Sequence, residues 1–139
     1  MKILVTGATG FIGSQVVKSL IKKFGKNSVV ILSSKNVEGL TCFEYHNMQD
    51  FGTEATSFDD ITHVIHAGAF TPKETDQAGN IEACCSNVDF TKTLLSHNFR
   101  SLVRILNIST VDVYEATNER LSESSPIRPV SLYGSSKLY

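Results

Sequence analysis

The sequence predicts an α/β fold in which a doubly wound, parallel, Rossmann-like sheet carries helices on its faces. Short apolar, β-branched runs alternate with stretches of helical periodicity, and the turns between them are short. No internal repeat, low-complexity tract or linker interrupts the alternation. In a chain of 139 residues, this order favours right-handed strand–helix–strand units and a single domain over residues 1–139.

The first three elements follow from the pattern of apolar residues. Residues 2–6 form a short strand that glycines end, and residues 29–32 form a continuous apolar run, as expected for a parallel strand covered on both faces. Between them, residues 12–24 have the spacing of a helix, and Gly25 ends it. The side chains expected on its single buried stripe are Ile12, Val16, Val17, Leu20, Ile21 and Phe24.

The middle of the chain continues the alternation. Residues 41–45 are a weaker strand, expected near the edge of the sheet, and residues 63–66 are another buried strand. Residues 81–99 predict a long helix. The side chains expected to point inward from it are Val88, Leu94 and Leu95.

The last elements are a fifth strand over residues 102–108 and a final helix that begins at Leu132. Pro126 and Pro129 mark the loop before that helix, because proline interrupts regular structure.

The composition excludes several classes of function. A net charge of −1 and a pI near 6.4 predict neither a nucleic-acid partner nor an anionic membrane surface. The apolar start is too short for a signal peptide or a membrane span. The three cysteines are odd in number and read as reduced thiols of a cytoplasmic protein. The four histidines lack metal-ligand spacing, so we expect no metal site.

A glycine-rich turn lies between the first strand and the first helix. Gly7 would permit the tight turn, Gly10 the approach of a pyrophosphate, and Gly13 the close packing of the helix on the sheet. Phe11 and Ile12 would present backbone N–H groups to the phosphates at the helix N-terminus. The strand–glycine–helix context predicts dinucleotide binding. The alternative is an ordinary strand–turn–helix without a ligand.

The end of the second strand bears on which dinucleotide binds. An acidic residue usually meets a free ribose 2′-hydroxyl there, whereas this chain has Ser33, Ser34 and Lys35. Two hydroxyls and a cation suit a 2′-phosphate, which favours NADP over NAD. The alternative interpretation makes Lys35 a surface lysine only.

Tyr133 and Lys137 stand four residues apart, so one face of a helix can carry both. Free tyrosine has a pKa of about 10, and a nearby fixed cation favours the phenolate form. The pair follows the fifth strand, whose end carries Ser109 and Thr110, and ligands bind at the carboxyl ends of such strands. Thr110 could orient a substrate alcohol toward Tyr133. Backbone hydrogen bonding at the strand end is the alternative role of Ser109 and Thr110.

Together these residues resemble the extended short-chain dehydrogenase/reductase family, in its NAD-dependent epimerase and dehydratase branch that acts on nucleotide sugars. The resemblance covers essentially the whole chain. The matching segments are residues 6–13 (TGATGFIG), 66–69 (HAGA), 87–88 (NV), 109–114 (STVDVY) and 133–137 (YGSSK), with Glu123, Pro126 and Pro129 at the entry to the last.

The resemblance implies a role for each site residue. Tyr133 would be the general acid or base, Lys137 would assist it and bind the nicotinamide ribose, and Thr110 would share the substrate proton. Asn47 and Met48 fall where the family contacts the adenine, although the family usually has Asp at the position of Asn47. The remaining implied cofactor contacts are Gly7, Gly10, Phe11, Ile12, Gly13, Ser33, Ser34, Lys35, Ala67, Gly68, Ala69 and Asn87.

Members of that family are much longer than this chain. The resemblance therefore implies the N-terminal portion of a homodimeric enzyme, truncated before the last sheet strands and the domain that binds the nucleotide sugar. We expect hydride transfer in the complete enzyme and no activity in this portion alone. The alternatives are an NADP-dependent reductase of a non-sugar carbonyl, a non-catalytic dinucleotide-binding module, and a truncated product that folds only in part.

Overall fold

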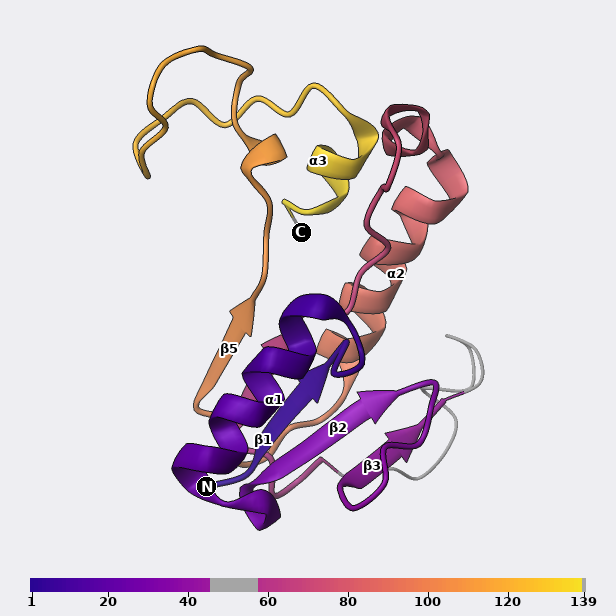
Figure 1. Ribbon diagram of the computed structural model, residues 1–139, viewed down its shortest axis with the longest axis vertical. Coiled ribbons are helices and arrows are strands. Elements are labelled where there is room, and N and C mark those ends of the chain that lie inside the picture. Colours follow the sequence, from indigo (N-terminus) through magenta and orange to yellow (C-terminus); the bar gives the residue numbers. More distant parts are fainter. Residues whose placement is uncertain (46–57, 139) are drawn as a thin grey trace. The chain divides into compact units, whose positions relative to one another are not determined.

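Five parallel strands form one sheet in the computed structural model, which describes residues 1–45 and 58–138 (Figure 1). The strand order is β3-β2-β1-β4-β5, so the predicted Rossmann-like parallel sheet is confirmed. The strands are β1 (Ile3–Thr6), β2 (Val29–Ser33), β3 (Thr41–Glu44), β4 (His63–His66) and β5 (Arg104–Asn107).

The strand register brings the carboxyl ends of the central strands together. Thr6, the last residue of β1, pairs with Leu32 of β2 on one side and with His66 of β4 on the other. The chain leaves β1 toward β2 and returns to β1 at β4, so the direction of winding reverses between β1 and β4. Ligands of open parallel sheets bind outside the carboxyl ends of the strands at such a reversal.

Helix α1 (Phe11–Phe24) packs on the sheet with a narrower face than its sequence predicts. Val17 is buried in a core with Val5 and Ile31, and Val16, Leu20 and Ile21 are only partly buried against that core. Ile12 and Phe24 are exposed, so their predicted burial is wrong. Successive residues of a helix turn by 100°, and the six predicted residues span too wide an arc to face one sheet.

The second long helix, α2 (Ile81–Ser96), begins where the sequence predicts and ends three residues earlier. Leu94 is buried and Val88 half-buried, but Leu95 is exposed, so its predicted inward orientation is wrong. Adjacent residues point about 100° apart on a helix, and only one of the two leucines can therefore face the core.

The other helical elements are short. The structure has three described 3₁₀ turns, η1 (Lys26–Ser28), η3 (Thr75–Gly79) and η4 (Val111–Val113), and one further helix, α3 (Leu132–Ser136). The sequence predicted α3 from Leu132 and none of the three turns, which are too short to show a hydrophobic period.

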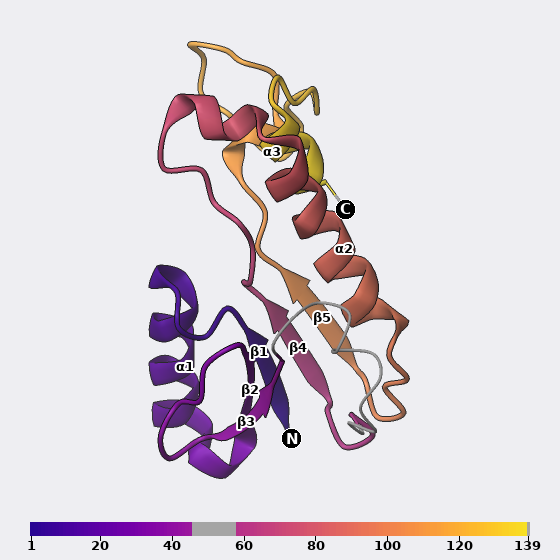
Figure 2. The ribbon, with the colours of Figure 1, turned by 90° about the vertical axis from the view of Figure 1, so that its right-hand side faces the viewer.

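Strand β5 is an edge of the sheet as far as the described residues extend (Figure 2). It pairs with β4 alone, and all four of its residues are exposed, including Ile105 and Leu106. Strands of parallel sheets are usually covered on both faces. Ile105 and Leu106 are neighbours in the strand and therefore point to opposite faces of the sheet, so each face of β5 carries one exposed apolar side chain.

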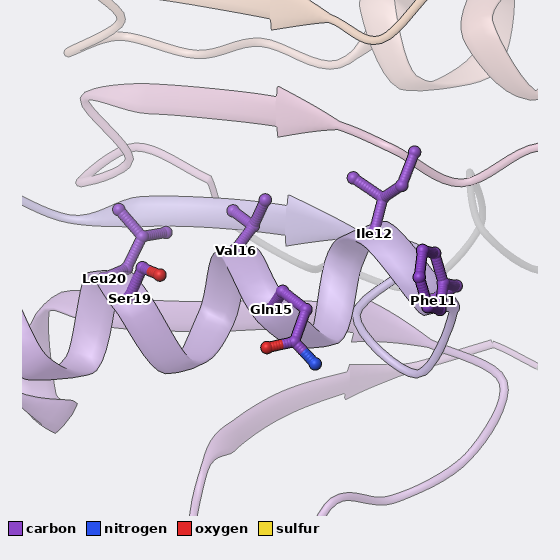
Figure 3. A pocket seen from close by; sticks show the side chains of 6 residues that line it. All are labelled: Phe11, Ile12, Gln15, Val16, Ser19 and Leu20. Atoms are coloured by element: carbon purple, nitrogen blue, oxygen red, sulfur yellow. The ribbon is translucent and has the colours of Figure 1, made fainter.

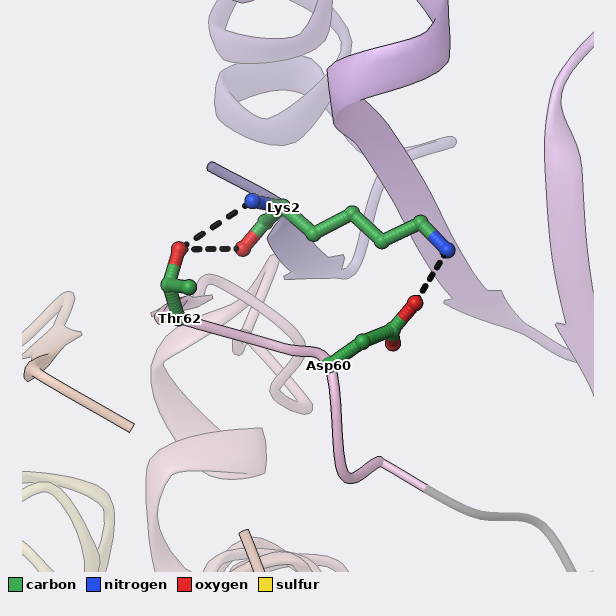
Figure 4. Close-up of polar contacts among 3 residues, drawn as sticks. All are labelled: Lys2, Asp60 and Thr62. Carbon is green, nitrogen blue, oxygen red and sulfur yellow. Dashed lines mark hydrogen bonds and ion pairs between the residues drawn. The ribbon is translucent and has the colours of Figure 1, made fainter. Parts of the chain in front are cut away.

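A polar cluster joins the amino ends of β1 and β4 (Figure 4). The backbone N–H of Lys2 donates to Thr62 Oγ1 at 3.1 Å, and the Thr62 hydroxyl is 2.9 Å from the Lys2 carbonyl oxygen. The Lys2 ammonium also pairs with the Asp60 carboxylate. Exposed ion pairs of this kind contribute about 0–1 kcal/mol. The cluster fixes the opposite end of the sheet from the glycine-rich turn.

The chain folds as two compact units. The first unit comprises Met1–Gly68 and Thr93–Ile108, and the second comprises Ala69–Lys92 and Ser109–Tyr139. The first unit holds the sheet and α1, and the second holds α3 and the first three turns of α2.

Candidate active site

The glycine-rich turn leads from β1 into α1 as the sequence predicts. Gly7 has a φ of +65°, in the left-handed region that favours glycine, and its carbonyl accepts the Gly10 N–H at 2.9 Å. Gly10 is the N-cap of α1, and no side chain caps that end of the helix. The first N–H groups of α1 therefore have no side-chain acceptor and suit an anion such as a phosphate.

Gly7 and Gly13 are both needed for close backbone approach. A Cβ at Gly7 would lie 2.6 Å from the Gly68 nitrogen and 2.7 Å from the Ala67 carbonyl carbon. A Cβ at Gly13 would overlap the Gly7 carbonyl. Gly13 thus allows the first turn of α1 to pack closely against the glycine-rich loop, and its role in close packing on the sheet stays a prediction.

The loop after β4 lies against the same turn. Gly68 donates its N–H to Thr6 Oγ1 at 2.9 Å, and Thr6 Oγ1 lies 2.7 Å from His66 Nδ1. Ala67 and Gly68, which the family resemblance assigns to the cofactor, therefore stand beside Gly7 at the carboxyl ends of β1 and β4.

The three residues that are predicted to lie near the ribose 2′-position of the dinucleotide are found at the end of β2 and directly after it. Ser33 is 5% exposed, and its Oγ accepts the Lys35 N–H at 3.1 Å. Ser34 and Lys35 are exposed. The bond from Lys35 fixes the turn that follows β2, and it leaves the side chains of Ser34 and Lys35 accessible to a ligand. Asn47 and Met48 lie outside the described residues.

An apolar groove runs along the side of α1 on which Val16 and Leu20 pack against the core (Figure 3). It contains Phe11, which is 90% exposed, and Ile12, both of which the sequence placed near the phosphates. Its lining residues are Phe11, Ile12, Gln15, Val16, Ser19 and Leu20. The side chains of Phe11 and Ile12 lie on an apolar surface, so any phosphate contact from these residues would come from their backbone N–H groups.

In the second unit, α3 carries Tyr133, and Lys137 is its C-cap. The Ser131 side chain begins the helix by accepting the Gly134 N–H at 3.0 Å. The Lys137 N–H donates to the Tyr133 carbonyl at 3.2 Å, which puts the two side chains one turn apart. Tyr133 is 8% exposed and Lys137 6% exposed.

The Lys137 ammonium is poorly solvated. Burial lowers its pKa below the ordinary value for lysine. Its Nζ makes no hydrogen bond or ion pair with the rest of the chain that the structure describes. No fully buried side-chain nitrogen or oxygen among the described residues lacks a hydrogen bond, so the Lys137 Nζ atom itself reaches the surface, where an anionic or hydroxylic ligand could contact it.

The segment after β5 packs on α3. A Cβ at Gly134 would overlap the Asp112 carbonyl of η4, so α3 touches that turn through a residue without a side chain. Ser109 Oγ donates to the Lys137 carbonyl at 3.0 Å. Thr110 caps η4 by accepting the Asp112 N–H at 3.3 Å, which leaves its hydroxyl proton to donate. The structure thus brings the segment of Thr110 next to the helix of Tyr133 and Lys137.

Asn87 is buried, and its side-chain amide forms hydrogen bonds within the protein. Its Oδ1 accepts the Phe70 N–H at 2.7 Å, and its Nδ2 donates to the Phe70 carbonyl at 3.2 Å and to Ser136 Oγ at 3.1 Å. Both amide hydrogens are therefore used. The implied contact of Asn87 with a cofactor stays a prediction; within the chain Asn87 joins the loop after β4, represented by Phe70, to α3.

The sequence did not single out Ser136 or Thr6 for these bonds, whereas the bond of Ser109 to the Lys137 carbonyl agrees with the alternative role of backbone hydrogen bonding. Ser136 also donates to the Tyr133 carbonyl at 2.8 Å, so it links Asn87 to the catalytic helix. Only the position of these residues within the matching motifs could have drawn attention to them. Serine and threonine hydroxyls form many local bonds, and the sequence does not show which of them are buried.

The predicted site residues divide between the two units. The first unit holds those assigned to the dinucleotide turn, to β2 and to residues 67–68, and the second holds Ala69, Asn87, Thr110, Tyr133 and Lys137. The described residues contain no cluster of three or more potential metal ligands. No helix among them has the length and apolar character that a membrane span requires.

Comparison with known proteins agrees with the motifs. Curated relatives include the ADP-L-glycero-D-manno-heptose-6-epimerase of Cupriavidus pinatubonensis, 30% identical over 99% of this chain and 43% of the relative. The dTDP-D-glucose 4,6-dehydratase of Dictyostelium discoideum is 28% identical over 98% of this chain and 38% of the relative. The chain therefore spans about two-fifths of the length of these relatives.

Solved structures show the same fold. The L-threonine dehydrogenase of Phytophthora infestans matches 99% of this chain, and 46% of its own, with a TM-score of 0.79 and 22% identity. The sequence profile of the NAD dependent epimerase/dehydratase family matches residues 3–139, which is nearly the whole chain. This protein belongs to the NAD-dependent epimerase/dehydratase family.

Proposed function

We propose that this chain is the cofactor-binding and catalytic portion of an NAD(P)-dependent enzyme that oxidises or reduces a nucleotide-linked sugar by hydride transfer. The observation that carries the proposal is the buried Tyr133–Lys137 pair on α3, with the Thr110 segment packed beside it. The two curated relatives named above, an epimerase and a dehydratase of nucleotide-linked sugars, support this substrate class.

The glycine-rich turn fits a dinucleotide. The N-terminus of α1 has no side-chain cap, and Gly10, its N-cap, has no side chain between the helix end and a ligand. The backbone N–H groups of Phe11 and Ile12 would hold the pyrophosphate. When bound there, the nicotinamide would accept a hydride from a sugar carbon and return it.

The chain's own residues would move the proton. Tyr133, as the phenolate, would take the proton of the sugar hydroxyl while the hydride leaves the same carbon, so the alcohol becomes a ketone. The Lys137 ammonium would stabilise the negative charge on the Tyr133 oxygen. Thr110, whose hydroxyl proton is free to donate, would hold the substrate oxygen in line with Tyr133.

Cofactor preference forms a second part of the proposal. The exposed Ser34 and Lys35 at the end of β2 support a preference for NADP over NAD, because a hydroxyl and a cation can both contact a 2′-phosphate. We also propose that the complete enzyme is a cytoplasmic homodimer and that the 139-residue chain alone has no turnover.

Calorimetric titration of the chain with NAD and with NADP tests the binding function. Gly10→Asp should abolish binding, because a carboxylate would stand where the pyrophosphate approaches α1. Gly79→Asp is the matched control, since Gly79 has no atom within 4 Å of an added Cβ and belongs to η3. Equal heats for the unmodified chain and for Gly10→Asp would overturn the proposal.

A further inference from the structure

Thr6 and His66 form a buried polar pair under the glycine-rich turn. They are direct partners across β1 and β4, and Thr6 Oγ1 lies 2.7 Å from His66 Nδ1. Thr6 is 0% exposed and His66 2% exposed. A polar contact at such depth contributes to stability only if each group keeps its hydrogen bonds.

The hydrogen bonds of the Thr6 hydroxyl indicate which ring nitrogen of His66 carries the proton. The Gly68 N–H already donates to Thr6 Oγ1 at 2.9 Å. If Nδ1 carried a proton, it would also donate to this oxygen, and the Thr6 hydroxyl hydrogen would have no acceptor among the described residues. The satisfied arrangement has the Thr6 hydroxyl donating to an unprotonated Nδ1, with the ring proton of a neutral His66 on Nε2.

Thr6 and His66 lie between two loops, the glycine-rich turn after β1 and the loop after β4. The Gly7 backbone, at a φ of +65°, lies so close to residues 67–68 that a Cβ would come within 2.6 Å of the Gly68 nitrogen. Thr6 immediately precedes Gly7, and its oxygen receives the Gly68 N–H. The orientation of the Thr6 hydroxyl therefore sets how the glycine-rich turn and the loop after β4 lie against each other.

We infer that Thr6 and neutral His66 are positioning residues for the dinucleotide: His66 Nδ1 fixes the Thr6 hydroxyl, and Thr6 holds Gly7 and Gly68 in register for the bound pyrophosphate. The inference rests on the proposed dinucleotide binding. Neither side chain needs to touch the ligand, because both act through the backbone of residues that do.

A pair of isosteric variants tests the hydroxyl. Thr6→Val keeps the shape of the side chain and removes the bond, whereas Thr6→Ser keeps the hydroxyl and removes a methyl group. We expect Thr6→Val to raise the Kd for NAD and NADP about tenfold, the effect of one well-formed bond, and Thr6→Ser to stay within about threefold of the unmodified chain. Circular dichroism and urea unfolding check that each variant folds.

The histidine is tested by substitution and by NMR. His66→Asn retains an acceptor near the position of Nδ1 and should bind better than His66→Leu, which has none. In the unmodified chain, ¹⁵N spectra of the histidine rings at neutral pH should show the neutral Nε2–H form for the signal that is missing in His66→Asn. A protonated Nδ1 in that signal would overturn the inference even if Thr6→Val failed to fold.

The outcomes separate the inference from the function on which it rests. If the unmodified chain binds neither dinucleotide, both fall together. If it binds, and folded Thr6→Val binds equally well, dinucleotide binding stands and the positioning role of Thr6 and His66 is wrong.

Discussion

Asn87 Nδ2 donates hydrogen bonds to Ser136 Oγ at 3.1 Å and to the Phe70 carbonyl, and Asn87 Oδ1 accepts the Phe70 N–H. Ser136 is the residue before Lys137, and its hydroxyl donates to the Tyr133 carbonyl. One buried amide therefore connects the loop after β4 to the helix of the proton-transfer pair. It is a structural bond of the second unit, and it places α3.

Replacement of Asn87 by Leu should destabilise the chain. The substitution leaves the partly buried backbone N–H and carbonyl of Phe70 without their side-chain partner, which costs about 1–3 kcal/mol. Urea unfolding followed by circular dichroism measures the loss. Asn98→Leu, at an exposed position, is the control and should change stability by less than about 0.5 kcal/mol. Equal stability of the two variants would contradict the bonding role of Asn87.

Gly13→Ala should disrupt the dinucleotide turn. The added methyl group overlaps the Gly7 carbonyl, so the loop or the first turn of α1 must move, at a cost of about 1–3 kcal/mol. Calorimetry should show NAD and NADP binding at least tenfold weaker, while Gly79→Ala, where a methyl meets open space, should leave both affinities unchanged. Unaltered binding by folded Gly13→Ala would show that the turn tolerates a side chain.

Lys35→Ala tests the preference for a 2′-phosphate. The exposed ammonium should contribute about 1 kcal/mol to NADP binding, so its removal should weaken NADP about fivefold and leave NAD unaffected. Lys18→Ala, an exposed position of α1, controls for the change in net charge. Tighter binding of NAD than of NADP by the unmodified chain would show that Ser34 and Lys35 do not select the cofactor.

Lys137→Met should stabilise the chain at neutral pH, because burial opposes the charge of Lys137 and lowers its pKa. We therefore expect Lys137→Met to have a higher Tm than the unmodified chain at neutral pH. The folded state binds fewer protons than the unfolded state between the two pKa values, so the stability of the unmodified chain rises with pH there. The advantage of Lys137→Met should shrink as the pH climbs through the folded pKa of Lys137 toward about 10.4.

Thermal unfolding from pH 7 to pH 10 measures that difference, and Lys92→Met, an exposed lysine of α2, is the control. A constant difference between Lys137→Met and the unmodified chain over this range would mean that the Lys137 charge does not affect stability.

The 139-residue chain should show no turnover alone. Positioning provides much of an enzyme's rate, and a displacement of about 1 Å can lower it roughly a hundredfold. The relatives are more than twice as long, and we expect their remaining length to hold the sugar. Absorbance of the reduced nicotinamide, followed with a panel of nucleotide sugars, is the measurement. Turnover that Tyr133→Phe removes would show that these residues suffice.

The sequence by itself determined the fold class, the position of every described strand to within two residues, and the glycine-rich turn between β1 and α1. It did so because apolar runs, glycines and motif spacing are local properties. The buried 63–66 strand and the glycine-rich turn before α1 were both predicted this way.

Tertiary structure decided which way each side chain points and how deeply it is buried. Ile12 and Leu95 are apolar and helical, yet they are exposed, because the sheet covers only part of each helix and the period does not show which part. The same holds for polar residues. Thr6, His66, Asn87 and Ser136 acquire their roles only when β1 lies beside β4 and when the loop after β4 meets α3, since those hydrogen bonds join residues 17 to 62 positions apart.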